Sequence, residues 1–392
     1  MSTSRRRLLQ SAALGALPVT ASAARRNIYD ELGITPVLNF RGTHTVIGAS
    51  KVWPELHEAM ATASQSYVSI DELQDKAGAR IAKLIGCEDA FITTGTAGGI
   101  TLAVAGALTG MDEAKVRQLP DLSGMRSEVI IQKVHRNGYD HAVRNTGVKI
   151  VTVETREQME SAFRDRTAAL YYLGGTSGDW AYETPVKLDE CIALAHRHNV
   201  PVIVDAANML PPFGNLQQLA KQGVDLICVS GGKHMRGPQC SGILAGRKDL
   251  IRAARLNSSP HSDAVGRGLK VGREEVVGLL VAVEKYAKLD FAAIDRQCQA
   301  QAEYLSREIQ KIPGMQVKFA PHDRTRRVHR LNVEWDRSKL SVDELERKLL
   351  EGTPRIAILR EGNGITFTVF MNDAGDEKHA ARRMKEIFAM VH

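Results

Sequence analysis

Seven short apolar runs, rich in β-branched residues, recur between residues 88 and 246, and polar or amphipathic stretches separate them. The runs cover residues 90–92, 129–131, 149–153, 168–173, 200–204, 225–229 and 242–245. Continuously apolar strands that alternate with crossovers are typical of a mostly parallel sheet with helices on both faces. Helical spacing of apolar residues at 73–85, 188–198 and 276–287 indicates such helices. The pattern predicts an α/β fold in which a seven-stranded, mostly parallel sheet forms the large domain.

The remainder of the chain follows a different pattern. Strands that look antiparallel, at residues 330–335 and 365–370, alternate with helices. We therefore expect a smaller α+β domain over residues 290–392 and the large domain over residues 61–289. Residues 24–60 form a separate N-terminal segment in this division.

The first 23 residues have the three-part layout of an export signal. Arg5, Arg6 and Arg7 precede a short apolar run at residues 12–19, and small residues at 21–23 suit a signal peptidase. The run is too short to span a bilayer permanently, so stable membrane insertion is not expected. Paired arginines before a moderately apolar core resemble a twin-arginine signal, which directs folded proteins to the periplasm. The alternative is a basic tail that carries no address.

Composition excludes several other classes. Removing residues 1–23 lowers the formal net charge from +7 to +4, so no nucleic-acid partner is expected. The five cysteines are scattered without a close pair, so they predict neither a disulfide framework nor a metal site. Their positions are Cys87, Cys191, Cys228, Cys240 and Cys298.

Three polar features follow strand ends in the order that a pyridoxal-phosphate (PLP) site requires. Residues 93–99, Thr-Thr-Gly-Thr-Ala-Gly-Gly, precede a helix expected at 100–108 and suit a phosphate cradle. Asp205 ends the fifth run, and Lys233 follows a Ser-Gly-Gly turn after the sixth. Each feature alone has a plain alternative: a packing turn, a helix cap or a surface lysine. Together they supply a phosphate site, a partner for a pyridine nitrogen and an amine for a Schiff base. The cradle is not a dinucleotide fingerprint, which disfavours a nicotinamide oxidoreductase.

Several segments resemble fold-type I PLP-dependent enzymes, which have the transferase fold of the aminotransferases. Residues 202–205 and 230–233 carry the general likeness. Residues 33–43, 233–239 and 268–279 resemble the selenocysteine-synthase-like family, in particular its D-glucosaminate-6-phosphate ammonia-lyase branch. The resemblance runs from about residue 29 to the C-terminus.

The resemblance implies roles for individual residues. Lys233 would form the Schiff base with pyridoxal 5'-phosphate, and Asp205 would pair with its pyridine nitrogen. The remaining cofactor positions are Gly95, Thr96, Ala97 and Ser230 at the phosphate, His135 stacked on the ring, Ala207 beneath it and Ser177 at the cofactor hydroxyl. His135 could instead be a plain surface-loop histidine.

Substrate residues are expected in two places. Asn39, Thr43 and Thr45 would line the entrance to the site, as the resemblance implies. Arg360 is the expected clamp for a substrate carboxylate, because a planar guanidinium binds carboxylates bidentately, and Arg355 is its rival.

The function expected from these residues is a lyase that removes ammonia from an amino acid or amino sugar acid by α,β-elimination. Racemase, aldolase and aminotransferase reactions use the same residues and stay open, as does an exported homologue that binds the cofactor without catalysis. Selenium transfer is not expected. Family members with that activity carry an additional N-terminal tRNA-binding region, whereas the expected mature chain begins almost directly at residues 32–36. We expect at least a homodimer, with residues 41–50 near the partner's site.

Overall fold

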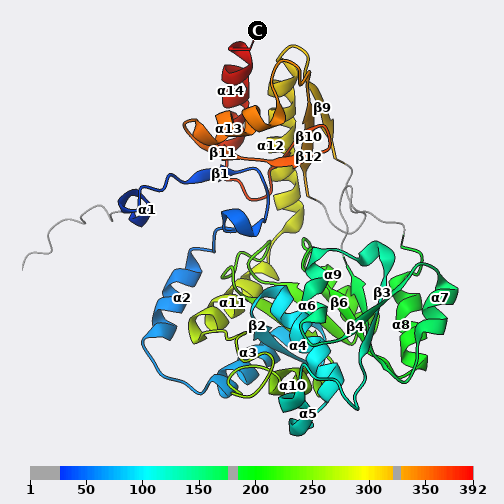
Figure 1. The fold of residues 1–392 in the computed structure, drawn as a ribbon. Coiled ribbons are helices and arrows are strands. Elements are labelled where there is room, and N and C mark those ends of the chain that lie inside the picture. Colours follow the sequence, from blue (N-terminus) through cyan, green and yellow to red (C-terminus); the bar gives the residue numbers. More distant parts are fainter. Residues whose placement is uncertain (1–26, 175–183, 321–327, 392) are drawn as a thin grey trace, which may run out of the picture. The chain divides into compact units, whose positions relative to one another are not determined.

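The computed structural model describes residues 27–174, 184–320 and 328–391 of the chain. The seven predicted runs all form strands of one sheet, in the spatial order β2-β8-β7-β6-β5-β3-β4 (Figure 1). These strands are β2 (Asp89–Thr93), β3 (Glu128–Gln132), β4 (Lys149–Val153), β5 (Thr167–Leu173), β6 (Val202–Asp205), β7 (Leu226–Ser230) and β8 (Gly242–Gly246). Only β8 runs against its neighbours, β2 and β7. The predicted α/β class and the mostly parallel sheet are therefore confirmed.

Both faces of this sheet are buried, which explains why its strands are apolar at successive positions. Val202 and Val204 pack into one hydrophobic cluster, whereas Ile203 between them packs into the other. The first cluster includes side chains from α3 (Ile70–Ile85), α7 (Arg156–Ala162), α8 (Leu188–Arg197), α9 (Gly214–Lys221) and α11 (Arg273–Tyr286). The second includes side chains from α4 (Gly95–Thr109), α6 (His141–Arg144) and α10 (Lys248–Leu256).

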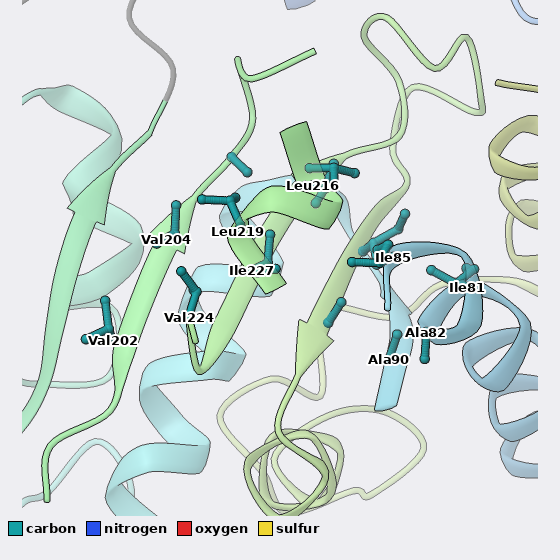
Figure 2. Packing of buried hydrophobic residues seen from close by; sticks show 14 of the residues in the cluster. Ile81, Ala82, Ile85, Ala90, Val202, Val204, Leu216, Leu219, Val224 and Ile227 are labelled. Atoms are coloured by element: carbon teal, nitrogen blue, oxygen red, sulfur yellow. The ribbon is translucent and has the colours of Figure 1, made fainter. Parts of the chain in front are cut away.

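Figure 2 shows part of the first cluster. Side chains of α9 and α3, among them Leu219 and Ile85, lie in one packed group with Val204 and Ile227 of the sheet. Each fully buried aliphatic side chain of this kind stabilises the fold by about 1.5–3 kcal/mol relative to an exposed one. This packing holds the strand ends, and the residues that follow them, in fixed positions.

The C-terminal strands form a separate four-stranded sheet in the order β12-β13-β10-β9. It consists of β9 (Gln316–Phe319), β10 (Arg330–Glu334), β12 (Leu359–Glu361) and β13 (Gly364–Thr368), and all three pairings are antiparallel. Side chains of this sheet share a third hydrophobic cluster with α12 (Phe291–Gln310), α13 (Val342–Glu351) and α14 (Asp376–Ala389). The predicted strands at 330–335 and 365–370 are thus present. The predicted domain boundaries stay predictions.

Helix α4 begins five residues earlier than the sequence predicts. Its first residue is Gly95, so the expected phosphate loop is the first turn of the helix itself. Glycine is a poor helix former, and the Gly-rich stretch therefore gives no helical signal. Burial overrides this preference here, because most of α4 lies within the protein.

The remaining elements are short or lie outside the two sheets. They are α1 (Ile28–Glu31), β1 (Val37–Asn39), η1 (Thr45–Ile47), α2 (Glu55–Ser64), α5 (Glu113–Gln118), η2 (Lys133–His135), η3 (Gly138–Asp140) and β11 (Arg355–Ala357). Within the described ranges, no helix combines the length and the apolarity that crossing a membrane requires.

Candidate active site

Asp205 is a buried carboxylate at the C-terminal end of β6. Only 4% of the residue is exposed. The backbone N–H of Ala207 donates to Oδ1 at 2.9 Å, and the hydroxyl of Tyr171 donates to Oδ2 at 2.9 Å. Burial raises the pKa of Asp205, while these two hydrogen bonds and the charge of Lys233 act in the opposite direction. A cation placed against this carboxylate would further relieve the cost of burying its charge.

The first turn of α4 supplies unpaired donors at the same end of the sheet. The first amides of a helix have no intrahelical acceptor, and they carry the positive end of the helix dipole. The side-chain hydroxyls of Thr94 and Thr96 are buried, and neither has a hydrogen-bond partner in the described structure. Buried hydroxyls without partners are costly, so an acceptor with several oxygens suits this position. The turn fits a phosphate group.

Strand register brings Ser230 to this turn. Gly242 of β8 pairs with Thr93 on one side and with Ser230 on the other. A Cβ atom on Gly242 would lie 2.4 Å from the carbonyl carbon of Gly95, so only glycine lets α4 start so close to β8. Gly95 itself has φ +61°, a conformation that glycine adopts without strain.

Lys233 lies in a turn that follows Ser230 and is held by a distant segment. Ser50 donates to the carbonyl of Gly232 at 2.8 Å, and the indole of Trp53 donates to the carbonyl of Met235 at 2.8 Å. Arg236 has a positive φ of 55° and lies over the ring of Trp53 at 4.0 Å. Backbone hydrogen bonds within the turn, such as the one from Arg236 N–H to the carbonyl of Lys233 at 3.0 Å, act together with these contacts to residues 50–53 to fix it.

His135 follows β3 and is buried, with 1% of the residue exposed. Its ring contacts Tyr172 edge to face, with centroids 4.4 Å apart, and Nδ1 accepts a hydrogen bond from the N–H of Leu173 at 3.4 Å. Burial lowers the pKa of His135 to about 4. The imidazole is neutral near pH 7, which suits a ring that stacks rather than one that carries charge.

A polar pocket lies beside the lysine turn. Asn208 and His234, near Asp205 and Lys233, line it together with cations from distant parts of the chain. Those cations are Arg41 and Arg330. The remaining lining residues are Gly42, Thr43, His44, Val328, Leu359, Thr368, Phe370 and Met371.

The electrostatics of this pocket favour an anion. Burial lowers the pKa of His44, and the charges of Arg41, Lys233 and Arg330 lower it further. Since all three charges act on one imidazole, they share one region of the structure. This concentration of positive charge suits an anionic group.

The predicted substrate residues fall in different places. Thr43 lines the pocket. Asn39 instead holds the turn before it, accepting from the N–H groups of Arg41 and Gly42 at 3.0 Å each and donating to the carbonyl of Gly42 at 3.1 Å. Thr45 begins η1 and accepts a hydrogen bond from the side chain of Gln239 through its carbonyl at 3.2 Å.

Neither arginine predicted as the carboxylate clamp lines the pocket. Arg360 is exposed and pairs with Asp343 and Glu346, and Arg355 is exposed on β11. The pocket arginines are not among the predicted site residues, although Arg41 lies in the segment 33–43 that carries the family resemblance and Arg330 begins a predicted strand. Ser177 lies outside the described residues.

The fold and these strand-end residues define a class, the PLP-dependent enzymes of fold type I. Residues 50–358 match the model of the aminotransferase class-V family, and the chain belongs to this family. It is 33% identical to D-glucosaminate-6-phosphate ammonia lyase of Salmonella typhimurium over 337 residues, which cover 83% of this chain and 87% of the relative. It is also 33% identical to 5'-C-glycyluridine monooxygenase-decarboxylase of a Streptomyces species over 341 residues, covering 84% and 83% of the two chains.

Solved structures agree with this assignment. A structure of D-glucosaminate-6-phosphate ammonia-lyase superposes with a TM-score of 0.80 at 30% identity, covering 94% of this chain and 99% of that one. A structure of SPT with PLP as an internal aldimine has a TM-score of 0.60 at 12% identity, covering 91% and 88%, and shares the fold. The predicted cofactor, pyridoxal 5'-phosphate, is thereby confirmed. The residues fit it, because the unpaired hydroxyls before and within α4 suit its phosphate and the buried Asp205 suits its ring nitrogen.

Proposed function

We propose that this chain is a PLP-dependent lyase that eliminates ammonia from an amino acid or amino sugar acid. One observation carries the proposal: a buried carboxylate ends β6, a lysine turn follows the adjacent strand β7, and the charge of the lysine acts on that carboxylate. The likeness to an ammonia lyase over most of both chains supports the reaction type.

In this proposal each residue has a defined task. The cofactor, when bound, supplies an electron-withdrawing ring that stabilises negative charge at the substrate's α carbon. Asp205 keeps a proton on the ring nitrogen, and Lys233 holds the cofactor and moves the α proton. Thr96, Ser230 and the first amides of α4 bind the phosphate, while His135 lies against the ring. Ala207, half-buried just beyond Asp205, packs beneath it.

The lysine assignment is tested by chemical trapping. Borohydride treatment of the holoenzyme should fix the mass of the cofactor on the peptide that contains Lys233. Lys233→Ala should abolish that adduct, and turnover should fall roughly 100-fold or more because the group that transfers the proton is gone. Asp205→Asn should still bind the cofactor but lose most turnover. An adduct that persists in Lys233→Ala would refute the lysine assignment, and normal turnover in Asp205→Asn would remove Asp205 from its role.

We further propose that Arg41 and Arg330 bind the substrate's anionic group. Arg330 is half-buried and held by Glu361 at 3.0 Å. The Nε of Arg41 is buried without a hydrogen-bond partner among the described residues. Arg41 and Arg330 line the pocket next to the lysine turn, and each has one acidic partner, Glu346 at 3.8 Å and Glu361 at 3.0 Å. Arg360 lies outside the pocket lining and pairs with two acidic side chains.

A substrate screen with a matched pair of variants tests both the reaction and this pocket. D- and L-amino acids, including phosphorylated amino sugar acids, are incubated with holoenzyme, and ammonia and keto acids are measured. Release of carbon dioxide and uptake of oxygen are followed too, because one relative is a monooxygenase-decarboxylase. For a substrate that turns over, Arg330→Met should raise KM roughly 10- to 100-fold, and Arg360→Met should leave it unchanged. The reverse result would favour Arg360 as the residue that binds the carboxylate, and a holoenzyme without any turnover would favour the non-catalytic homologue.

Two further proposals concern the whole chain. We propose that residues 1–23 are a twin-arginine signal and that the enzyme works in the periplasm, on the strength of the three-part layout of that segment. We also propose at least a homodimer, with residues 41–50 near the partner's site, since neighbouring subunits commonly complete fold-type I sites. Sedimentation of active enzyme measures the latter, and an active monomer would exclude it.

A further inference from the structure

Tyr171 reaches Asp205 from the neighbouring strand. On β5 and β6, Tyr171 is in register with Ile203, and Leu173 with Asp205. Tyr171 and Asp205 are therefore diagonal neighbours on one face of the sheet, a separation that a long side chain spans. The phenol hydroxyl donates to Oδ2 of Asp205 at 2.9 Å.

The side chain of Tyr171 is buried among apolar residues, where a phenylalanine would pack equally well without burying a hydroxyl. Tyr171 is 1% exposed and belongs to the hydrophobic cluster that includes Phe91, Ile203 and Cys228. Burying a hydroxyl costs free energy unless it is hydrogen-bonded. Asp205 accepts the hydrogen bond of this hydroxyl, and this contact makes the position suitable for a tyrosine.

Tyr171 and Ala207 together fix the carboxylate. One donor reaches each oxygen, which sets the plane of the group and leaves a lone pair on each oxygen for a third donor. Donors to a carboxylate favour its charged form. Burial and the charge of Asp205 raise the pKa of Tyr171 well above its usual value, so the phenol keeps the proton that it donates.

We propose that Tyr171 is a positioning residue that orients Asp205 and keeps it a weak base, so that the shared proton stays on the ring nitrogen of the cofactor rather than on the carboxyl group. This inference rests on the proposed role of Asp205. Without the phenol hydroxyl, a buried carboxyl with one donor fewer holds a proton more strongly. The proton would then move from the ring toward Asp205, and the ring would withdraw electrons less well.

The test compares Tyr171→Phe, which deletes one oxygen atom, with the wild-type holoenzyme. Nitrogen NMR of isotope-labelled cofactor reports whether the ring nitrogen is protonated, and a binding titration gives the cofactor's dissociation constant. We expect the ring-nitrogen resonance to move toward that of neutral pyridine and the dissociation constant to rise by roughly tenfold. Tyr286→Phe is the matched control: it removes another buried phenol hydroxyl, on α11, and should change neither readout.

A second substitution keeps the test decisive if Tyr171→Phe does not fold. Replacing Tyr171 with 3-fluorotyrosine retains the hydroxyl and makes it a stronger donor, so the dissociation constant should fall and the ring nitrogen should stay protonated. A wild-type dissociation constant and resonance position in Tyr171→Phe would overturn the proposal. If only the 3-fluorotyrosine variant folds, a dissociation constant equal to that of the wild type would overturn it. Asp205→Asn distinguishes a failure of the role proposed for Asp205 from a failure of the role proposed for Tyr171. If that variant also leaves the resonance unchanged, the role of Asp205 fails. If the resonance is unchanged in Tyr171→Phe but moves in Asp205→Asn, the role of Asp205 stands and Tyr171 is structural.

Discussion

At the scale of single residues, His135 couples the cofactor site to the stability of the fold. Its ring is buried against Tyr172 and accepts a hydrogen bond from Leu173. Both contacts suit the neutral imidazole, and burial lowers the pKa of His135 from 6.5 to about 4. The unfolded chain therefore binds a proton at a higher pH than the folded one does.

This difference predicts how stability changes with pH. The contribution of His135 to the free energy of unfolding is complete above pH 6.5 and is lost as the pH falls from 6.5 to about 4. The loss amounts to about 3 kcal/mol. In His135→Phe the free energy of unfolding should depend less on pH between 6.5 and about 4, because phenylalanine does not titrate. Urea unfolding at a series of pH values measures this free energy. The control is His57→Phe, which replaces an exposed histidine. Parallel curves for wild type and His135→Phe would contradict the low pKa.

The sequence predicts an arginine that binds the substrate carboxylate, Arg360 or its rival Arg355, whereas the arginines that line the pocket are Arg41 and Arg330. Arg330 and Arg360 lie on different strands of one antiparallel sheet, and both pair with β13, opposite Thr368 and Ile365 respectively. Which of them reaches the pocket depends on strand register and on the acidic neighbours Asp343 and Glu346, which occupy Arg360. Neither register nor these ion pairs can be read from the local sequence.

At the scale of elements, the strands were predictable because burial on both faces leaves a strong apolar signal. Asp205 and Ser230 could be placed for the same reason, since each ends such a strand. The reversed direction of β8 left no local signal, because an apolar strand looks the same in either direction. The early start of α4 was missed because its glycines are selected for close approach to β8 rather than for helix formation.

The conformation of the lysine turn could not be predicted from the local sequence either. Ser50 and Gly232, which share a hydrogen bond, lie 182 positions apart in the sequence. The left-handed conformation of Arg236 likewise goes with its contact to Trp53 and not with any turn-forming residue at that position. The sequence placed Lys233 after a strand. Its orientation depends on long-range contacts that form only in the folded protein.

At the scale of the whole molecule, the site exists only in the folded chain. The carboxylate and the phosphate turn come from strands of the large sheet, the lysine turn is pinned by residues 50–53, and the pocket cations come from positions 41 and 330. An unfolded chain holds none of these groups near one another. If these residues bind the cofactor as proposed, its phosphate and ring meet their partners only after the chain has folded.

This dependence leads to a prediction about export. Pyridoxal phosphate is made in the cytosol, and a route that threads unfolded chains would leave the cofactor behind, whereas the twin-arginine route carries folded cargo. The triple variant Arg5→Lys, Arg6→Lys, Arg7→Lys keeps the charge but removes the paired arginines. It should retain cytoplasmic holoenzyme and abolish export. Replacing residues 1–23 with a general-secretion signal should deliver chains that carry little cofactor. Fractionation, with activity and cofactor absorbance measured in each compartment, tests both variants. Equal amounts of periplasmic holoenzyme from the triple-lysine variant would refute twin-arginine export, while the assignment of the cofactor site would be unaffected.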